Sequence, residues 1–131
     1  MCRLLLRVSW RHKLCAVATI GTLWVTSCES PTRPSQKVWS VDSRDNGRLL
    51  SVGSGDEIDV TLQTIGPGQY DDHPSVSSPA VVFSKVAILT PPNPGGPRQL
   101  FQFKAVSPGQ SVISIPHTVQ NSRFEITVDV R

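Results

Sequence analysis

Alternation of apolar and polar residues with a period of two is the dominant pattern in the C-terminal two thirds of the chain. It is clearest in "EIDVTLQT", "QLFQFKAV" and "FEITVDVR". Because successive side chains of a strand point to opposite faces, each segment predicts a strand with one buried face. The residues predicted to point inward are Ile58, Val60 and Leu62 in the first segment, Phe101, Phe103 and Ala105 in the second, and Phe124, Ile126, Val128 and Val130 in the third.

Weaker strand signals occur in "KVWSV", "RLLSV", "AVVFSKVAIL" and "QSVISI". The third of these is apolar on both faces, which indicates a central or bulged strand. Prolines fall between the segments or at their ends, where no ladder hydrogen bond is lost. The pattern therefore predicts an all-β protein, an antiparallel β-sandwich of about seven strands, with Trp39 and the four phenylalanines in its core.

The first 27 residues have the layout of an export signal. Four basic residues precede an apolar run over residues 14–25, which is shorter than the roughly 20 residues that span a bilayer. We expect a signal helix that is cleaved after residue 27, a flexible tether over residues 28–36, rich in Pro and Ser, and a β-sandwich domain over residues 37–131.

The segment "VTSC" at the end of this signal resembles the lipobox of bacterial lipoproteins, in which small residues precede a cysteine that is lipidated and becomes the N-terminus. Thr26 and Ser27 occupy the small positions, and Cys28 would carry the lipid. The alternative is an ordinary secretory signal, which would leave Cys28 without an intramolecular partner because Cys2 and Cys15 depart. The resemblance implies an exported protein anchored to the cell envelope, on the periplasmic face of either membrane or at the cell surface.

Cleavage also changes the charge of the protein. The whole chain has 13 basic and 10 acidic residues, whereas the chain from Cys28 onward has nine basic and ten acidic residues. The alkaline pI of about 9.0 is therefore a property of the signal. No basic patch in the remaining chain indicates a nucleic-acid partner.

Chemistry-bearing residues are sparse. Asp71, Asp72 and His73 form the one cluster of ionisable groups, but neighbouring side chains of an extended chain point to opposite sides. We therefore expect a solvated turn there and no metal site, and we expect His117 to be an exposed loop residue. No nucleophile and base share a recognisable spacing, and "GSGD" at residues 53–56 is typical of a turn, so we predict no catalytic site and no cofactor.

Three features together resemble the immunoglobulin-like fold of chagasin-type inhibitors of papain-like cysteine proteases. They are "LLSVGSGDEIDVTLQ", "PGGPRQLFQFKAVSPGQSVISI" and the final alternating strand. The family inhibits through three loops, and "PPNPGGPR" corresponds to its glycine-rich loop through Gly95 and Gly96. The other two loops, "IGPGQYDDHPSVSSP" and "PHTVQNSR", do not preserve the family's Asn-Pro-Thr-Thr-Gly and Arg-Pro-Trp/Phe motifs.

Strand direction predicts where these loops lie. If "QLFQFKAV" and "QSVISI" form a hairpin through "SPG", the loops before and after them emerge at the same end. The long loop joins them there if it contains a short strand near Tyr70, which we expect to be an exposed aromatic anchor. The candidate binding residues are Tyr70, Asn93, Gly95, Gly96, Arg98 and His117.

Two function classes follow from these observations. The first is a lipid-anchored, non-catalytic module of the cell envelope that binds a protein partner through its loops, with a papain-like cysteine protease as the first candidate. The second is a structural component of an envelope assembly, whose sheet edges or faces make the contacts and whose loops recognise nothing specific.

Overall fold

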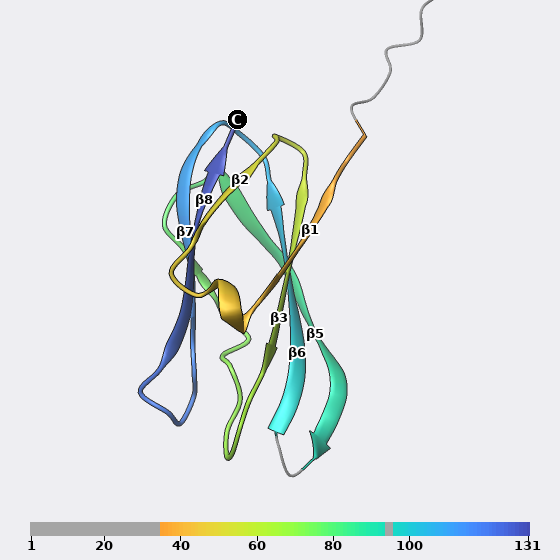
Figure 1. The fold of residues 1–131 in the computed structure, drawn as a ribbon, viewed down its shortest axis with the longest axis vertical. Helices are drawn as coiled ribbons and strands as arrows, with labels where there is room; N and C mark the ends of the chain where they lie inside the picture. Colours follow the sequence, from red (N-terminus) through yellow and green to blue (C-terminus); the bar gives the residue numbers. More distant parts are fainter. Residues whose placement is uncertain (1–34, 94–95) are drawn as a thin grey trace, which may run out of the picture. The chain divides into compact units, whose positions relative to one another are not determined.

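A computed structural model describes residues 35–93 and 96–131 (Figure 1). The expected signal peptide, Cys28 and Gly95 lie outside these ranges. No helix among the described residues is long and apolar enough to cross a membrane. The elements are β1 (Val38–Asp42), the 3-10 turn η1 (Ser43–Asp45), β2 (Leu49–Val52), β3 (Glu57–Gln63), β4 (Ser75–Val76), β5 (Val81–Asn93), β6 (Gly96–Ala105), β7 (Gly109–Pro116) and β8 (Arg123–Val130).

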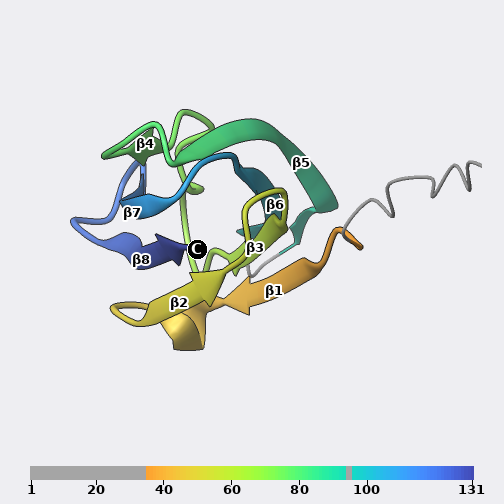
Figure 2. The same ribbon diagram turned by 90° about the horizontal axis from the view of Figure 1, so that it is seen from above.

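Two four-stranded sheets pack face to face, and Figure 2 shows them as separate layers. The first sheet has the order β1-β3-β6-β5, and the second has the order β2-β8-β7-β4. The predicted all-β sandwich is therefore confirmed, with one refinement. Strand β1 pairs in parallel with β3, and β2 pairs in parallel with β8. The reason is that the chain crosses between sheets after β1, so β1 and β2 cannot form an antiparallel hairpin.

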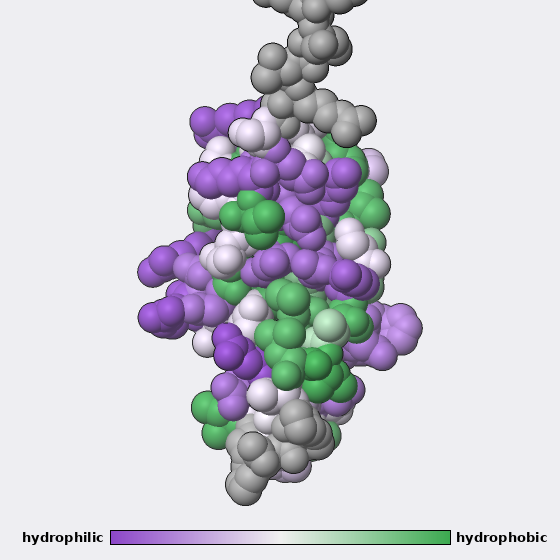
Figure 3. All heavy atoms as spheres, turned by 90° about the vertical axis from the view of Figure 1, so that its right-hand side faces the viewer, coloured by the Kyte–Doolittle hydropathy of each residue, from purple (hydrophilic) through white to green (hydrophobic). Residues whose placement is uncertain are grey.

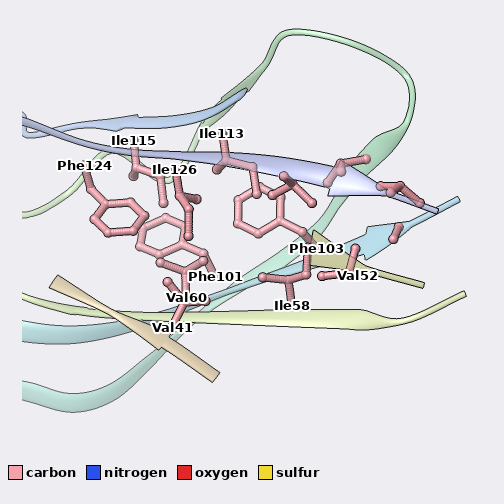
Figure 4. Close-up of a cluster of buried hydrophobic side chains, with 14 of the residues drawn as sticks. Val41, Val52, Ile58, Val60, Phe101, Phe103, Ile113, Ile115, Phe124 and Ile126 are labelled. Atoms are coloured by element: carbon pink, nitrogen blue, oxygen red, sulfur yellow. The ribbon is translucent and has the colours of Figure 1, made fainter. Parts of the chain in front are cut away.

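Alternating apolar side chains of both sheets fill the space between the layers (Figure 4). Every residue predicted to point inward from the three clearest strands is buried. Trp39 and Phe83 are only partly buried and pack against the edge of this core. The buried hydrophobic residues are Val41, Val52, Ile58, Val60, Leu62, Ala80, Val81, Phe101, Phe103, Ala105, Ile113, Ile115, Phe124, Ile126, Val128 and Val130.

Strands β6 and β7 are not the hairpin that the "SPG" turn predicted, because they belong to different sheets. The backbone N–H groups of Val106 and Ser107 both donate to the carbonyl of Ala80, at 2.9 and 3.4 Å, as the chain crosses. The prediction failed because a short glycine turn can connect strands within a sheet or between sheets, and the packing of two layers decides which.

Strand β5 differs most from its sequence pattern. It is bulged, as expected, but it lies at the edge of the first sheet and not at its centre. The second sheet covers only one face of β5, and Val82, Ile88 and Leu89 are about half exposed. The strand also continues through Pro91 and Pro92, which a free edge tolerates because no ladder hydrogen bond is required there.

Asp56 fastens the first strand of the domain to the turn before β3. Its carboxylate accepts hydrogen bonds from the indole N–H of Trp39 at 2.9 Å and from the backbone of Gly53 and Lys37, at 2.9 and 3.2 Å. The Lys37 ammonium lies 3.5 Å from the centroid of the Trp39 ring. The indole bond, followed by the backbone bond from Gly53, holds the pKa of Asp56 below its ordinary value.

We expect Asp56→Asn to lower the free energy of unfolding at pH 7, because an amide cannot accept all three hydrogen bonds. A lowered native pKa means that the carboxylate stabilises the fold above the unfolded-state pKa of about 3.9. That stabilisation is lost as pH falls through the native pKa. Urea unfolding from pH 7 to pH 3 should therefore show the difference between wild type and variant shrinking on acidification, and a constant difference would contradict this role.

Candidate functional site

Three segments lie at one end of the sandwich, opposite the end where Lys37 and Arg131 are located (Figure 1). They are residues 64–74 after β3, residues 96–98 at the start of β6, and residues 117–122 between β7 and β8. Strand direction places them together, because β3, β5 and β7 all end where β6 and β8 begin. We refer to residues 64–74, 96–98 and 117–122 as the loop end.

Hydrogen bonds join these loops into one surface. The N–H of Thr64 donates to the carbonyl of Pro97 at 3.3 Å, which attaches the first loop to β6. The side-chain amide of Gln120 donates to the carbonyl of Ile65 at 2.9 Å, and the backbone N–H of Thr118 donates to the carbonyl of Gln69 at 2.9 Å. The long loop therefore bridges the two shorter ones.

Tyr70 is held by the buried side chain of Gln99. The Gln99 amide accepts from the N–H of Tyr70 and donates to its carbonyl, both at 2.9 Å. Tyr70 also forms an isolated β-bridge with His117, and the two rings meet edge to face at 5.3 Å. The short strand-like pairing expected near Tyr70 is thus present, but its side chain is half-buried against the core and is not the exposed anchor that we predicted.

His117 is buried, contrary to the expectation of an exposed histidine. Its Nδ1 atom accepts hydrogen bonds from the backbone N–H groups of Val119 and Gln120, at 3.3 and 3.0 Å. An accepting Nδ1 carries no proton, so the proton of the neutral ring is on Nε2. The imidazole therefore fixes the turn that presents Val119. Its burial depends on the distant residue Tyr70, so it could not be inferred from the position of His117 beside Pro116.

Two apolar side chains of the loop end, Ile65 and Val119, are largely exposed, and we call them its apolar tips. Ile65 is 85% exposed and Val119 is 65% exposed, although the Ile65 carbonyl accepts from Gln120 and the Val119 N–H donates to His117. Sequence reasoning missed both because it searched the loops for aromatic and glycine residues. A lone isoleucine beside "GPG" was the available signal, since such a loop has no strand face on which to bury it.

Asp71, Asp72 and His73 converge, contrary to the prediction that they would point apart. One ligand atom from each lies within 4.8 Å of the others, because the N–H of His73 donates to the Asp71 carboxylate at 2.9 Å and closes a turn. This backbone bond lowers the pKa of Asp71. No further carboxylate, histidine or cysteine from residues 35–93 or 96–131 joins the group, and Asp72 and His73 are exposed, so the geometry is that of a solvated turn.

The remaining candidate residues divide between the loop end and the flank of the first sheet. Asn93 is the last residue of β5 and pairs with Gly96, whereas Gly95 lies outside the described residues. Arg98 is exposed on the outer face of the first sheet, where it lines a polar pocket of about 400 Å³. The other residues lining this pocket are Asp42, Ser43, Arg44, Thr61 and Gln63.

Comparison with solved structures gives the strongest likeness to known proteins. The cysteine protease inhibitor EhICP2 from Entamoeba histolytica superposes with a TM-score of 0.59 at 18% identity, over 76% of this chain and 100% of that one. The chain therefore has a chagasin-like fold. Amebosin shares this chagasin-like fold with a TM-score of 0.56 at 14% identity, over 72% of this chain and 98% of that one. No protein-family model and no curated protein matches the chain.

Gly96 offers a test of how closely the loops pack within this chagasin-like fold. Its φ of 80° is in the left-handed region, and a Cβ there would lie 2.8 Å from the Thr64 Cβ and 2.9 Å from the Thr64 carbonyl oxygen. Gly47 has a similar φ of 77° with nothing within 4 Å of such a Cβ.

We therefore expect Gly96→Ala to cost more stability than Gly47→Ala, because both variants share the backbone strain of about 1–2 kcal/mol but only the first also displaces Thr64. Urea denaturation of the two variants measures the difference. Equal losses would show that Thr64 and β6 are not packed as the loop end requires.

Proposed function

We propose that this protein is a non-catalytic, protein-binding module that blocks papain-like cysteine proteases with its loop end and is held on the cell envelope by lipid on Cys28. The observation that carries the binding role is that three loops are bonded together while Ile65 and Val119 project from them. A surface of this kind presents apolar anchors on a backbone that is already ordered.

Ordering before binding matters energetically. Association costs free energy for every side chain and loop that must be immobilised, so a preorganised surface retains more of its contact energy. Here the Gln99 bonds to Tyr70, the His117 bonds and the Gln120 bond to Ile65 restrain the tips in the free protein. Gly68 and Gly96, both with positive φ, let the loops pack closely, because a Cβ at these positions would meet Val119 and Thr64 at 2.8 Å.

A protease target is supported by the fold shared with a protein described as a cysteine protease inhibitor. The loop motifs that the chagasin-type family uses are absent from the two loops that follow β3 and β7. In this protein the apolar tips would replace them, so inhibition would depend on Ile65 and Val119 and not on an aromatic residue.

The position of the chain ends supports presentation from a membrane. The N–H of Glu57 donates to the carbonyl of Lys37 at 2.8 Å, so the chain enters the domain beside the start of β3. This is the end opposite the loops. A flexible tether over residues 28–36, reaching about 3 Å per residue when extended, would therefore join the domain at the end that the proposed partner does not use.

The free edge of β5 favours a second candidate function, a structural component that joins an envelope assembly. Exposed Val82, Ile88 and Leu89 lie along it, and Figure 3 shows apolar side chains gathered on this side of the domain. Its register shifts count against this reading, because bulges protect an edge from pairing with other strands.

Replacing the apolar tips tests the binding role. We expect Ile65→Asp and Val119→Asp each to weaken inhibition of papain by the full chain by about 30-fold or more, the loss typical of a central anchor of an interface. Val38→Asp is the matched control, because Val38 is 53% exposed but lies at the opposite end of the domain.

Progress curves of papain hydrolysis with a fluorogenic substrate give the inhibition constants. Absence of inhibition by the wild-type chain would reject the protease target. Equal losses in the tip variants and in Val38→Asp would reject the loop end as the binding surface and favour the structural component.

Lipidation has its own test. We expect mass spectrometry of the membrane fraction to show a chain that begins at Cys28 and carries added acyl mass, and Cys28→Ser to abolish both the cleavage and the added mass. Circular dichroism of that variant should retain the β signature, because the core of the described residues is formed by side chains from Val41 to Val130. A soluble, unmodified product cut elsewhere would reject the anchor.

A further inference from the structure

The polar pocket that Arg98 lines is at the margin of the loop end. Arg98 pairs with Gln63 across the last rung between β3 and β6, and both residues line the pocket. Its opposite wall comes from Asp42, Ser43 and Arg44, where β1 passes into η1. A partner seated on the loop end would therefore reach this pocket without contacting the rest of the sheet face.

The two arginines of the pocket are not equivalent. Arg44 is already neutralised, because its guanidinium Nε lies 3.1 Å from both carboxylate oxygens of Asp42. The side-chain and backbone hydrogen bonds from Arg44 lower the pKa of Asp42 to about 2, so this pair remains ionised at neutral pH. Arg98 makes no ion pair within residues 35–93 and 96–131.

The pocket has an excess of positive charge at Arg98, because the one acidic residue in its lining, Asp42, is paired with Arg44. The segment from Val81 to Ala105 contains Lys85, Arg98 and Lys104 and no acidic residue. By register, Arg98 and Lys104 share the outer face of the first sheet, but Lys104 pairs with Glu57 at the tether end. Six residues of strand separate the two cations, about 20 Å. Of these three cations, Arg98 lines the pocket beside the loop end, and it makes no ion pair with the described residues.

We propose that this pocket accepts a carboxylate side chain from the protein that binds the loop end, with Arg98 as the charged contact. The inference rests on the proposed function for the identity of that protein, and it adds an acidic residue at the margin of the partner's binding site. A planar guanidinium beside the hydroxyl of Thr61 and the amide of Gln63 matches the acceptor geometry of a carboxylate.

Charge reversal at two positions of the same strand tests the proposal. We expect Arg98→Glu in the full chain to weaken papain inhibition by about tenfold and to reduce its salt dependence, because an attractive contact at the rim becomes repulsive. Lys104→Glu makes the same change of charge at the far end of β6 and should alter inhibition by less than about twofold. If the two variants weaken inhibition equally, the change in net charge explains the result and the proposed role of the pocket is wrong.

The outcomes separate this inference from the proposed function. Inhibition that Ile65→Asp abolishes but Arg98→Glu leaves unchanged would support the loop end and overturn the pocket. If the wild-type chain does not inhibit papain, the pocket is still tested by titrating the full chain in detergent micelles with N-acetyl-aspartate and following the arginine side-chain NMR signals. We expect Arg98 to shift more than Arg123, which is exposed at the same end and already near Glu125. Equal shifts would overturn the proposal.

Discussion

The loop end depends on the double hydrogen bond between the Gln99 side chain and the backbone of Tyr70. Gln99 is in β6, it points into the sandwich, and it is 1% exposed. An amide buried at such a position must satisfy both its donor and its acceptor, and the backbone of Tyr70 provides one partner for each. The two hydrogen bonds therefore hold the 64–74 loop in place, as backbone pairing with a neighbouring strand would.

Once this contact is made, the remaining contacts of the loop end follow. Tyr70 is placed beside His117, whose Nδ1 then caps the turn at Val119 and Gln120. Gln120 in turn reaches back to the carbonyl of Ile65. A chain of polar contacts thus runs from a buried strand to two exposed apolar tips. This arrangement explains how a loop rich in glycine can present its side chains in a fixed geometry.

The two ends of the domain have different chemistry. At the end where the chain enters the domain, the Asp56 carboxylate accepts hydrogen bonds from the Trp39 indole and from two backbone N–H groups. The loop end combines apolar tips with the positive charge of Arg98 at its margin. In the proposed function, the chain enters the domain at the first end and the partner binds at the second, so attachment and recognition use opposite ends of one sandwich.

The sequence by itself determined the two-layer class, the inward faces and every strand except the two-residue β4, because period-two alternation is a local property and β4 is too short to show it. The chagasin-like resemblance and the common end of the loops were also accessible from motif order and strand direction. Only the tertiary structure decided that β5 is an edge, that β6 and β7 lie in different sheets, and that Tyr70 and His117 are structural while Ile65 and Val119 are exposed. The physical reason is that these properties depend on contacts between residues far apart in the chain, such as Gln99 with Tyr70, and no local pattern records which partner a side chain will meet.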